Sequence, residues 1–220
     1  MIKAIILDFD GTIMDTESTA FRIWREIYET HGHELTIDKW SECIGVPNSS
    51  FDPYEDLTEL TGLPLDRMEM ALLIVTRESE YNKGLPLLPG IENLILAAKS
   101  MGLKLGIASS ADHAWIDDHL GRKKLLDRFD AIVCREDTSR HKPFPDPYIK
   151  ALSELSCKPG EAVAIEDSPN GIRAAKAAGI FCVAVPNPVT HSLIPDNAAD
   201  LKLCSLADIS LQELLERASL

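Results

Sequence analysis

The sequence lacks the features that mark membrane-spanning, secreted and disulfide-linked proteins. No uninterrupted apolar run approaches the roughly 20 residues that a transmembrane helix needs. The first residues form a short apolar segment that ends in aspartates, which differs from a signal peptide with a cleavage site of small residues. The five cysteines are scattered, odd in number and without a Cys-x-x-Cys pair, as expected of small core residues in a reducing compartment. These absences favour a soluble, cytoplasmic protein.

Positive charge is also scarce. The 22 Lys and Arg residues stand against 35 Asp and Glu residues, which gives a formal net charge of −13. So acidic a chain is a poor partner for nucleic acid or for an anionic membrane. An anionic small substrate would need local positive charge or a metal ion to be held. The 220 residues suffice for one large domain or a domain with an insertion, and a monomer is the default expectation.

The segment after residue 15 shows helical periodicity only. Apolar residues recur at helical spacing, as in Leu65, Met68, Leu72 and Val75, and no strand pattern interrupts the segment. Residues 16–83 are therefore expected to form an all-helical insertion. Helices are predicted over 16–31, part of 36–43, 56–61 and 66–82.

Beyond a linker at 84–90, short apolar runs alternate with helical patterns. Such alternation predicts right-handed βαβ units and a mostly parallel sheet. The fully apolar run before Asp8 fits a central strand that is buried on both faces. Strands are predicted at 4–7, 103–108, 131–134, 162–165, 181–185 and 201–203. Helices are predicted at 91–101, 112–120, 147–155 and 168–178, with a last helix that starts near Ser205 or Ser210.

Two aspartates, Asp8 and Asp10, follow the first strand at alternate positions. In an extended chain such residues point the same way, so both carboxylates can converge beyond the strand's carboxyl end, where open α/β sheets bind ligands. Neighbouring carboxylates repel unless a cation or hydrogen bonds offset the repulsion, and Mg²⁺ is a hard cation that prefers oxygen ligands. The alternative is a polar turn after a buried strand.

Three further groups follow later strands and are expected at the same edge of the sheet. Ser109 and Ser110 offer hydroxyl and N–H groups for a phosphate, although serines are also common in ordinary turns. Lys142, stiffened by a following proline, offers a fixed ammonium, with a solvated surface lysine as the alternative. Glu166 and Asp167 would complete an oxygen shell for Mg²⁺, or they serve the dipole of the next helix.

Asp8-Phe9-Asp10-Gly11-Thr12 resembles the first motif of the haloacid dehalogenase superfamily of phosphotransferases. Ser109, Lys142-Pro143 and Glu166-Asp167 follow in the order of that superfamily's other motifs. The helical insertion resembles the cap of the subfamily that includes β-phosphoglucomutase and small sugar-phosphate phosphatases. The resemblance implies an α/β fold with a three-layer, Rossmann-like core formed by residues 1–14 and 84–220. Residues 15–83 would form a helical cap domain.

The resemblance also implies roles for these residues. Asp8 would be the nucleophile that becomes an aspartyl phosphate, and Asp10 the general acid and base. Mg²⁺ would be held by Asp8, the Asp10 backbone carbonyl and Asp167, with Glu166 beside them. The phosphoryl oxygens would be held by Ser109, Ser110 and Lys142, with backbone contacts from Gly11 and Thr12. The implied enzyme is a Mg²⁺-dependent phosphatase of the haloacid dehalogenase type that acts on a small phosphomonoester, such as a sugar phosphate.

The cap segment departs from the phosphomutase pattern at two places. The β-phosphoglucomutase branch carries a histidine where this chain has Ala20, and an arginine in the loop that here reads Gly-Val-Pro-Asn at 45–48. Both departures favour water as the acceptor over a sugar, with a phosphomutase as the alternative and a non-catalytic binding module as a third reading. Substrate choice is assigned to Glu17, Trp24 and the loop 45–50 with Asn48, although core packing also explains Trp24.

Overall fold

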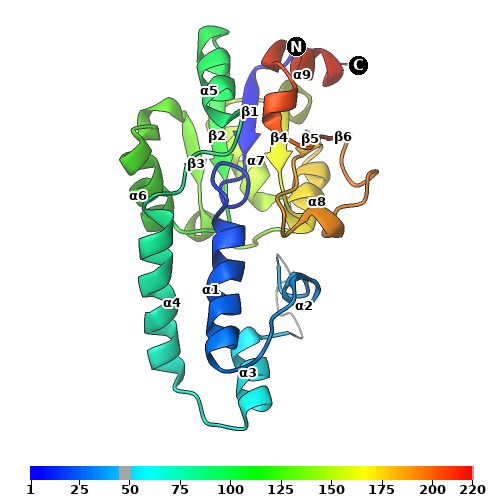
Figure 1. Ribbon diagram of the computed structural model, residues 1–220. Coiled ribbons are helices and arrows are strands. Elements are labelled where there is room, and N and C mark those ends of the chain that lie inside the picture. Colours follow the sequence, from blue (N-terminus) through cyan, green and yellow to red (C-terminus); the bar gives the residue numbers. More distant parts are fainter. Residues whose placement is uncertain (45–50, 220) are drawn as a thin grey trace.

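A parallel six-stranded sheet between two layers of helices forms the upper part of the molecule (Figure 1). The computed structural model describes residues 1–44 and 51–219. The strand order is β3-β2-β1-β4-β5-β6, and every neighbouring pair is parallel, which confirms the predicted fold class. The strands are β1 Ala4–Leu7, β2 Lys104–Ala108, β3 Ala131–Val133, β4 Ala162–Glu166, β5 Phe181–Ala184 and β6 Leu201–Lys202.

The central strands are apolar at successive positions because helices cover both faces of the sheet. All four residues of β1 are buried. Ile5, which lies between Leu105 and Val163 in register, packs on one face, whereas Ile6 packs on the other. The first face is covered by α5 Ile91–Ser100, α6 His113–Lys123 and α9 Leu211–Arg217, and the second by α7 Asp146–Glu154 and α8 Pro169–Ala177.

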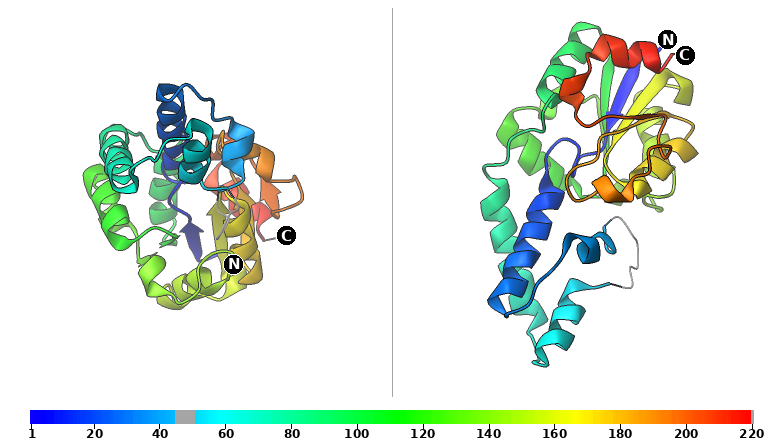
Figure 2. Two further views of the ribbon diagram at one scale, coloured as in Figure 1. Left: turned by 90° about the horizontal axis from the view of Figure 1, so that it is seen from below. Right: turned by 45° about the vertical axis from the view of Figure 1, so that its right-hand side comes forward.

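Four helices lie beyond the carboxyl ends of the strands, at the opposite end of the molecule from α9 (Figures 1 and 2). Most members of a third apolar cluster come from this part of the chain, with Ile23, Ile27, Tyr28 and Leu57 among the most buried, and Val189 joins them from the segment after β5. Aspartate or threonine side chains cap each helix at its start. The helices are α1 Thr16–Thr30, α2 Ile37–Ser41, α3 Pro53–Thr61 and α4 Arg67–Asn82.

Helix α4 forms where it was predicted, but it buries a different face. The stripe that indicated the helix is largely exposed, since Met68, Leu72 and Val75 keep 82%, 68% and 61% of their accessible surface. Met70 is buried instead, and Ile74 packs against the helical cluster. Periodicity predicts the helical repeat but does not determine which stripe of the helix packs against a partner.

The remaining differences concern helix starts and short turns. Helix α3 begins three residues earlier than predicted, because Asp52 caps it and Pro53 takes its first position. Both predicted starts of the last helix are real caps, since Ser210 caps α9 and Ser205 caps a 3₁₀ turn. The 3₁₀ turns are η1 Leu126–Arg128, η2 Arg135–Asp137, η3 Pro159–Glu161, η4 His191–Leu193 and η5 Leu206–Asp208.

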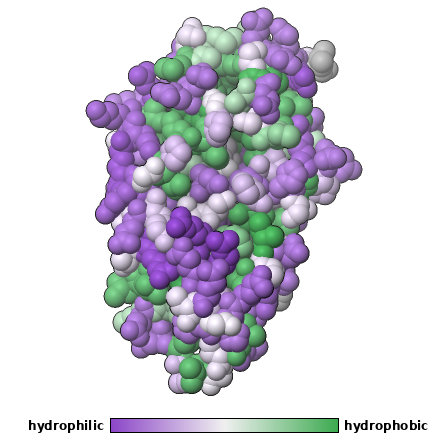
Figure 3. Space-filling model, in the orientation of Figure 1, coloured by the Kyte–Doolittle hydropathy of each residue, from purple (hydrophilic) through white to green (hydrophobic). Residues whose placement is uncertain are grey.

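The surface of the face in Figure 3 is mostly polar, with smaller apolar groups between the polar residues. This mixture agrees with the high content of charged residues. Within residues 1–44 and 51–219, every helix is too short or too polar to cross a membrane.

Candidate active site

The turn that follows β1 brings two carboxylates to a cavity of about 460 Å³. Asp8 and Asp10 both line it, and the Phe9 side chain between them is fully buried in the core. Gly11 makes the turn with a φ of +79°, and a Cβ there would lie 2.2 Å from Asp167 Oδ2. The cavity is lined by Asp8, Asp10, Glu17, Cys43, Ile44, Ser109, Ser110, Ala111, Arg135, His141, Lys142, Asp167, Ser168 and Asn170.

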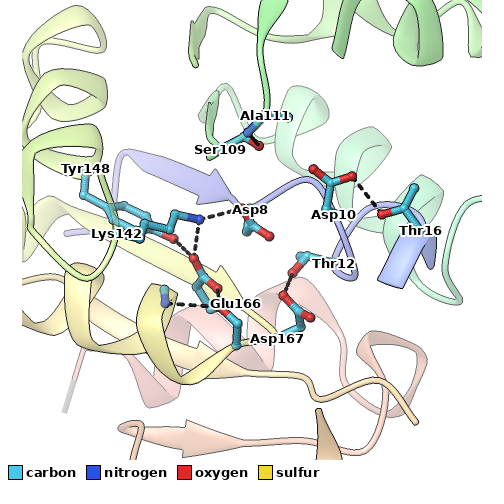
Figure 4. A network of polar contacts seen from close by, with 12 residues as sticks. Asp8, Asp10, Thr12, Thr16, Ser109, Ala111, Lys142, Tyr148, Glu166 and Asp167 are labelled. Atoms are coloured by element: carbon cyan, nitrogen blue, oxygen red, sulfur yellow. Dashed lines mark hydrogen bonds and ion pairs between the residues drawn. The ribbon is translucent and has the colours of Figure 1, made fainter. Parts of the chain in front are cut away.

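A buried ion-pair network connects three segments of the chain at this edge (Figure 4). Lys142 Nζ lies 2.5 Å from Asp8 Oδ1 and 2.6 Å from Glu166 Oε1. Only 8% of Lys142 is exposed, so the solvated-lysine alternative does not hold. The Tyr148 hydroxyl donates to the same Glu166 oxygen at 2.6 Å. One ammonium therefore bridges two buried carboxylates.

At the carboxyl edge of the sheet, three carboxylates lie close together, and the single ammonium of Lys142 cannot neutralise all of them. Carboxylate oxygens of Asp8, Glu166 and Asp167 lie within 4.8 Å of one another. Burial raises the pKa of Asp8, with Lys142 opposing the rise, and burial with the neighbouring Asp8 carboxylate raises the pKa of Asp167. An all-oxygen, anionic donor set of this kind fits a hard divalent cation.

Three hydrogen bonds fix the Glu166 carboxylate, and one of them comes from Lys142. Its Oε1 accepts from Lys142 and Tyr148, and its Oε2 accepts from the Ser168 hydroxyl at 3.2 Å. Helix α8 packs against it closely enough that a Cβ at Gly171 would lie 1.9 Å from the carboxylate. Its predicted place in a metal shell stays a prediction.

Asp167 is oriented by two neutral donors. Asn187 Nδ2 donates to Oδ2 at 2.7 Å, and the Thr12 hydroxyl donates to Oδ1 at 3.3 Å. The backbone N–H of Gly11 donates to the Met14 carbonyl at 2.7 Å, and neither Gly11 nor Thr12 lines the cavity. We expected the backbone N–H groups of Gly11 and Thr12 to contact a phosphoryl group. In the structure, both N–H groups donate to carbonyl oxygens of the turn itself. Thr12 instead supports Asp167.

The two serines after β2 lie at the cavity, as predicted. Ser109 is 2% exposed, its N–H donates to the Val133 carbonyl, and its Oγ accepts from the Ala111 N–H at 3.0 Å. Ser110 is exposed and also lines the cavity. The Ser109 hydroxyl thus shapes its own turn and keeps its proton available for an acceptor in the cavity.

Asp10 is held by a different kind of partner from Asp8. The Thr16 hydroxyl and the Trp115 indole N–H both donate to its Oδ1, at 2.8 Å and 2.9 Å. Burial raises the pKa of Asp10, and these two hydrogen bonds limit the rise.

The helical side of the cavity contributes Glu17, Cys43 and Ile44. Burial, reinforced by the carboxylates of Asp10 and Asp15, raises the pKa of Glu17 to about 7. Trp24 packs against the helical cluster and does not line the cavity, which agrees with the core-packing alternative. Asn48 and the rest of the loop 45–50 lie outside the described residues.

Sequence reasoning missed several residues of the site. Trp115 and Tyr148 were placed on the right helices, but helical periodicity alone does not reveal which side chains reach the aspartates. Arg135 and His141, which line the cavity, carried no distinguishing signal. Asn187 could have been predicted, because it lies just beyond β5 and therefore at the carboxyl edge of the sheet.

A parallel sheet with paired carboxylates and a buried lysine at its carboxyl edge is the arrangement expected of a haloacid dehalogenase-like hydrolase. Residues 5–185 match the family described as haloacid dehalogenase-like hydrolase. The chain belongs to this family.

Relatives that match this chain over nearly its full length are named as phosphatases or as a phosphomutase. A Bacillus subtilis (strain 168) protein named "Putative phosphatase YhcW" is 41% identical, over 98% of this chain and 97% of its own. "Phosphorylated carbohydrates phosphatase" of Thermotoga maritima is 31% identical, over 97% of each chain. "Beta-phosphoglucomutase" of Bacillus subtilis is 32% identical, over 98% of this chain and 95% of its own.

Solved structures agree with the sequence matches. CbbY from Rhodobacter sphaeroides, solved in complex with phosphate, superposes with a TM-score of 0.75 at 29% identity, covering 94% of this chain and 96% of its own. Together with the family match, these relatives support a phosphoric monoester hydrolase with phosphatase or phosphomutase-like chemistry.

Proposed function

We propose that the protein is a Mg²⁺-dependent phosphatase that hydrolyses a small phosphomonoester through an aspartyl-phosphate intermediate on Asp8. The observation that carries the proposal is the pairing of Asp8 with the buried Lys142 at 2.5 Å, beside a second carboxylate, Asp10, in one cavity. A sugar phosphate is the proposed substrate class, in line with the Thermotoga maritima relative named for phosphorylated carbohydrates.

The proposed reaction has two phosphoryl transfers. An Asp8 oxygen attacks phosphorus, the bond from phosphorus to the leaving oxygen breaks, and Asp10 gives that oxygen its proton. Asp10 then takes a proton from water, the water oxygen attacks phosphorus, and the bond to Asp8 breaks to release inorganic phosphate. Lys142, Ser109 and Ser110 hold the phosphoryl oxygens in both transfers.

The carboxylate set fits Mg²⁺ because it is anionic, all-oxygen and rigidly held. Asp8, the Asp10 backbone carbonyl and Asp167 would hold the ion, with Glu166 acting beside them through Lys142. When bound, Mg²⁺ supplies charge neutralisation and alignment of the phosphoryl group.

We further propose that residues 15–83 act as a cap over a core formed by residues 1–14 and 84–220, hinged at 13–15 and 84–90. The apolar cluster centred on the four helices, which also takes in Val189 and Leu193, supports this division. Closure of the cap would remove bulk water from the cavity and place Glu17 and the loop 45–50, with Asn48, against the substrate. The proposed enzyme is a cytoplasmic monomer.

A phosphomutase of the β-phosphoglucomutase type is the second candidate, favoured by the 32% identical relative of that name. Ala20 on α1 speaks against it, since a methyl group offers no proton donor or acceptor with which to hold Asp10 away from water. A non-catalytic module is the least supported reading, because every position of the proposed machinery carries a competent side chain.

The test is phosphate release from a panel of phosphomonoesters, with Mg²⁺ present and then chelated. The panel includes p-nitrophenyl phosphate, nucleotides, hexose 6-phosphates and β-glucose 1-phosphate, with a parallel assay for glucose 6-phosphate formation. Mg²⁺-dependent release without isomer formation supports the phosphatase. Isomer formation without net release establishes the phosphomutase, and no turnover by either assay contradicts both.

A further inference from the structure

The two donors to Asp10 converge on a single oxygen. Thr16, at the first turn of α1, and Trp115, on α6, both donate to Oδ1, at 2.8 Å and 2.9 Å. Asp10 Oδ2 accepts no hydrogen bond within the described part of the chain. Figure 4 shows this second oxygen pointing away from Thr16, on the side of Ser109 and Asp8.

The indole of Trp115 is itself held in place. Its ring packs on His119, one turn further along α6, with ring centroids 4.2 Å apart, and His119 Nδ1 lies 2.8 Å from the Trp115 carbonyl oxygen. His119 in turn meets Phe9 edge to face at 5.9 Å. One face of α6 therefore contacts both the Phe9 ring and the neighbouring Asp10 carboxylate.

An indole N–H can only donate a hydrogen bond. The Asp10 oxygen that it contacts must therefore act as an acceptor, and a proton carried by this carboxyl group is directed to the other oxygen. That oxygen is the one without a protein donor, on the side of the cavity.

We propose that Trp115 is a positioning residue that selects which oxygen of Asp10 carries the transferable proton. The inference rests on the proposed function, in which Asp10 protonates the leaving oxygen. Trp115 does not line the cavity, and it acts only through Asp10. Without its N–H, Oδ1 keeps only the Thr16 hydroxyl, which can accept as well as donate. The proton can then lie on either oxygen, and it is presented to the leaving group in a fraction of the molecules.

Trp115→Phe tests the proposal, because phenylalanine keeps an aromatic ring beside His119 and removes the N–H. An alkoxide leaving group needs a proton from Asp10, whereas nitrophenolate leaves without one. We expect kcat/KM to fall about tenfold for the best hexose 6-phosphate of the panel and less than about twofold for p-nitrophenyl phosphate. Equal losses with both substrates, or no loss with either, would overturn the proposal.

Trp40→Phe is the matched control. Trp40 is 6% exposed, and its indole nitrogen has no hydrogen-bond partner within the described residues, so the same substitution removes no hydrogen bond. We expect the ratio of kcat/KM for the two substrates to stay at its wild-type value in this variant. A changed ratio in Trp40→Phe would show that the ratio does not report on Asp10.

A spectroscopic measurement tests the contact without changing Trp115. In protein labelled with ¹⁵N-tryptophan, Asp10→Asn is expected to shift the Trp115 indole N–H resonance and to leave those of Trp24 and Trp40 unchanged. An unshifted Trp115 resonance would contradict the proposal. Since this readout needs no turnover, failure of the contact is distinguishable from failure of the proposed phosphatase activity.

Discussion

The two walls of the cavity differ in how their polar groups are paired. On the sheet edge, the carboxylates of Asp8 and Glu166 meet Lys142 at 2.5 Å and 2.6 Å, and Asp167 is held by Asn187. On the helical side, the half-buried Glu17 carboxylate takes part in no hydrogen bond within the described residues. The sheet edge is thus preorganised for one kind of chemistry. On the helical wall, by the proposed function, Glu17 would gain its partners from a substrate.

The largest effect should come from the proposed nucleophile of the sheet edge, Asp8. Asp8→Asn keeps the shape of the side chain but removes the attacking oxygen's charge, so we expect kcat to fall by at least about a thousandfold. Phosphate release under saturating substrate measures it. Asp127→Asn, an exposed aspartate on η1, is the control and should keep wild-type activity. Phosphate release by Asp8→Asn at the wild-type rate would contradict the assignment of Asp8 as the nucleophile.

The next effect concerns stability. Lys142→Met leaves the buried carboxylates of Asp8 and Glu166 without a cation, and we expect the free energy of unfolding to fall by about 3–5 kcal/mol. Urea denaturation measures the change. The control is Lys150→Met, which breaks a surface pair with Glu154 and should cost less than about 1 kcal/mol. Equal losses would mean that the Lys142 network contributes no more than a surface ion pair.

Helix α4, which packs against the helical cluster, offers a comparison within one element. Met70→Ala removes a side chain that is 8% exposed, and we expect a loss of about 2–4 kcal/mol in unfolding free energy. Leu72→Ala, at a position that is 68% exposed, should change it by no more than about 0.5 kcal/mol. A larger loss for Leu72 than for Met70 would show that the exposed stripe is covered in solution.

The smallest effect is expected at Glu17, and it depends on pH. The pKa of this carboxyl group is about 7 in the folded protein against 4.5 unfolded, mainly because of burial. Its protonation favours folding below pH 4.5, and this advantage is lost as pH rises to 7. Glu17→Gln should therefore be the more stable protein above pH 7, by about 1–2 kcal/mol after allowance for solvent screening.

Urea denaturation at pH 5 and pH 8, without divalent cations, measures this difference. The exposed Glu59→Gln variant serves as the control and should show the same small change at both pH values. A Glu17→Gln variant whose advantage fails to grow between pH 5 and pH 8 would contradict the raised pKa.

The sheet edge was largely predictable because strand geometry converts sequence position into spatial position. Once β1, β2 and β4 are read from their apolar runs, Asp8, Ser109 and Asp167 must meet at one edge. Lys142 was harder to predict because it lies in a loop, and only the structure shows that it is buried. The backbone amides of Gly11 and Thr12 were assigned to substrate, but the turn uses them itself.

Contacts made by the helices were less predictable, since a helical repeat leaves open which face of the helix packs. The stripe at Met68, Leu72 and Val75 indicated α4 correctly, yet the buried side chain is Met70. For the same reason Trp115 was assigned to a helix without any indication that its indole reaches Asp10. Contacts between elements depend on how the elements dock, and short-range periodicity carries no information about docking.

The close approach of α8 to Glu166 restricts how this chain can diverge. Any side chain at position 171 would enter the space of the carboxylate, since even a Cβ would lie 1.9 Å from it. Glutamate at 166 and glycine at 171 are therefore tied to each other across β4 and α8. A descendant that lost the glycine would have to displace the glutamate, and with it the group that orients Lys142. In an alignment of relatives, the two positions should change together or not at all.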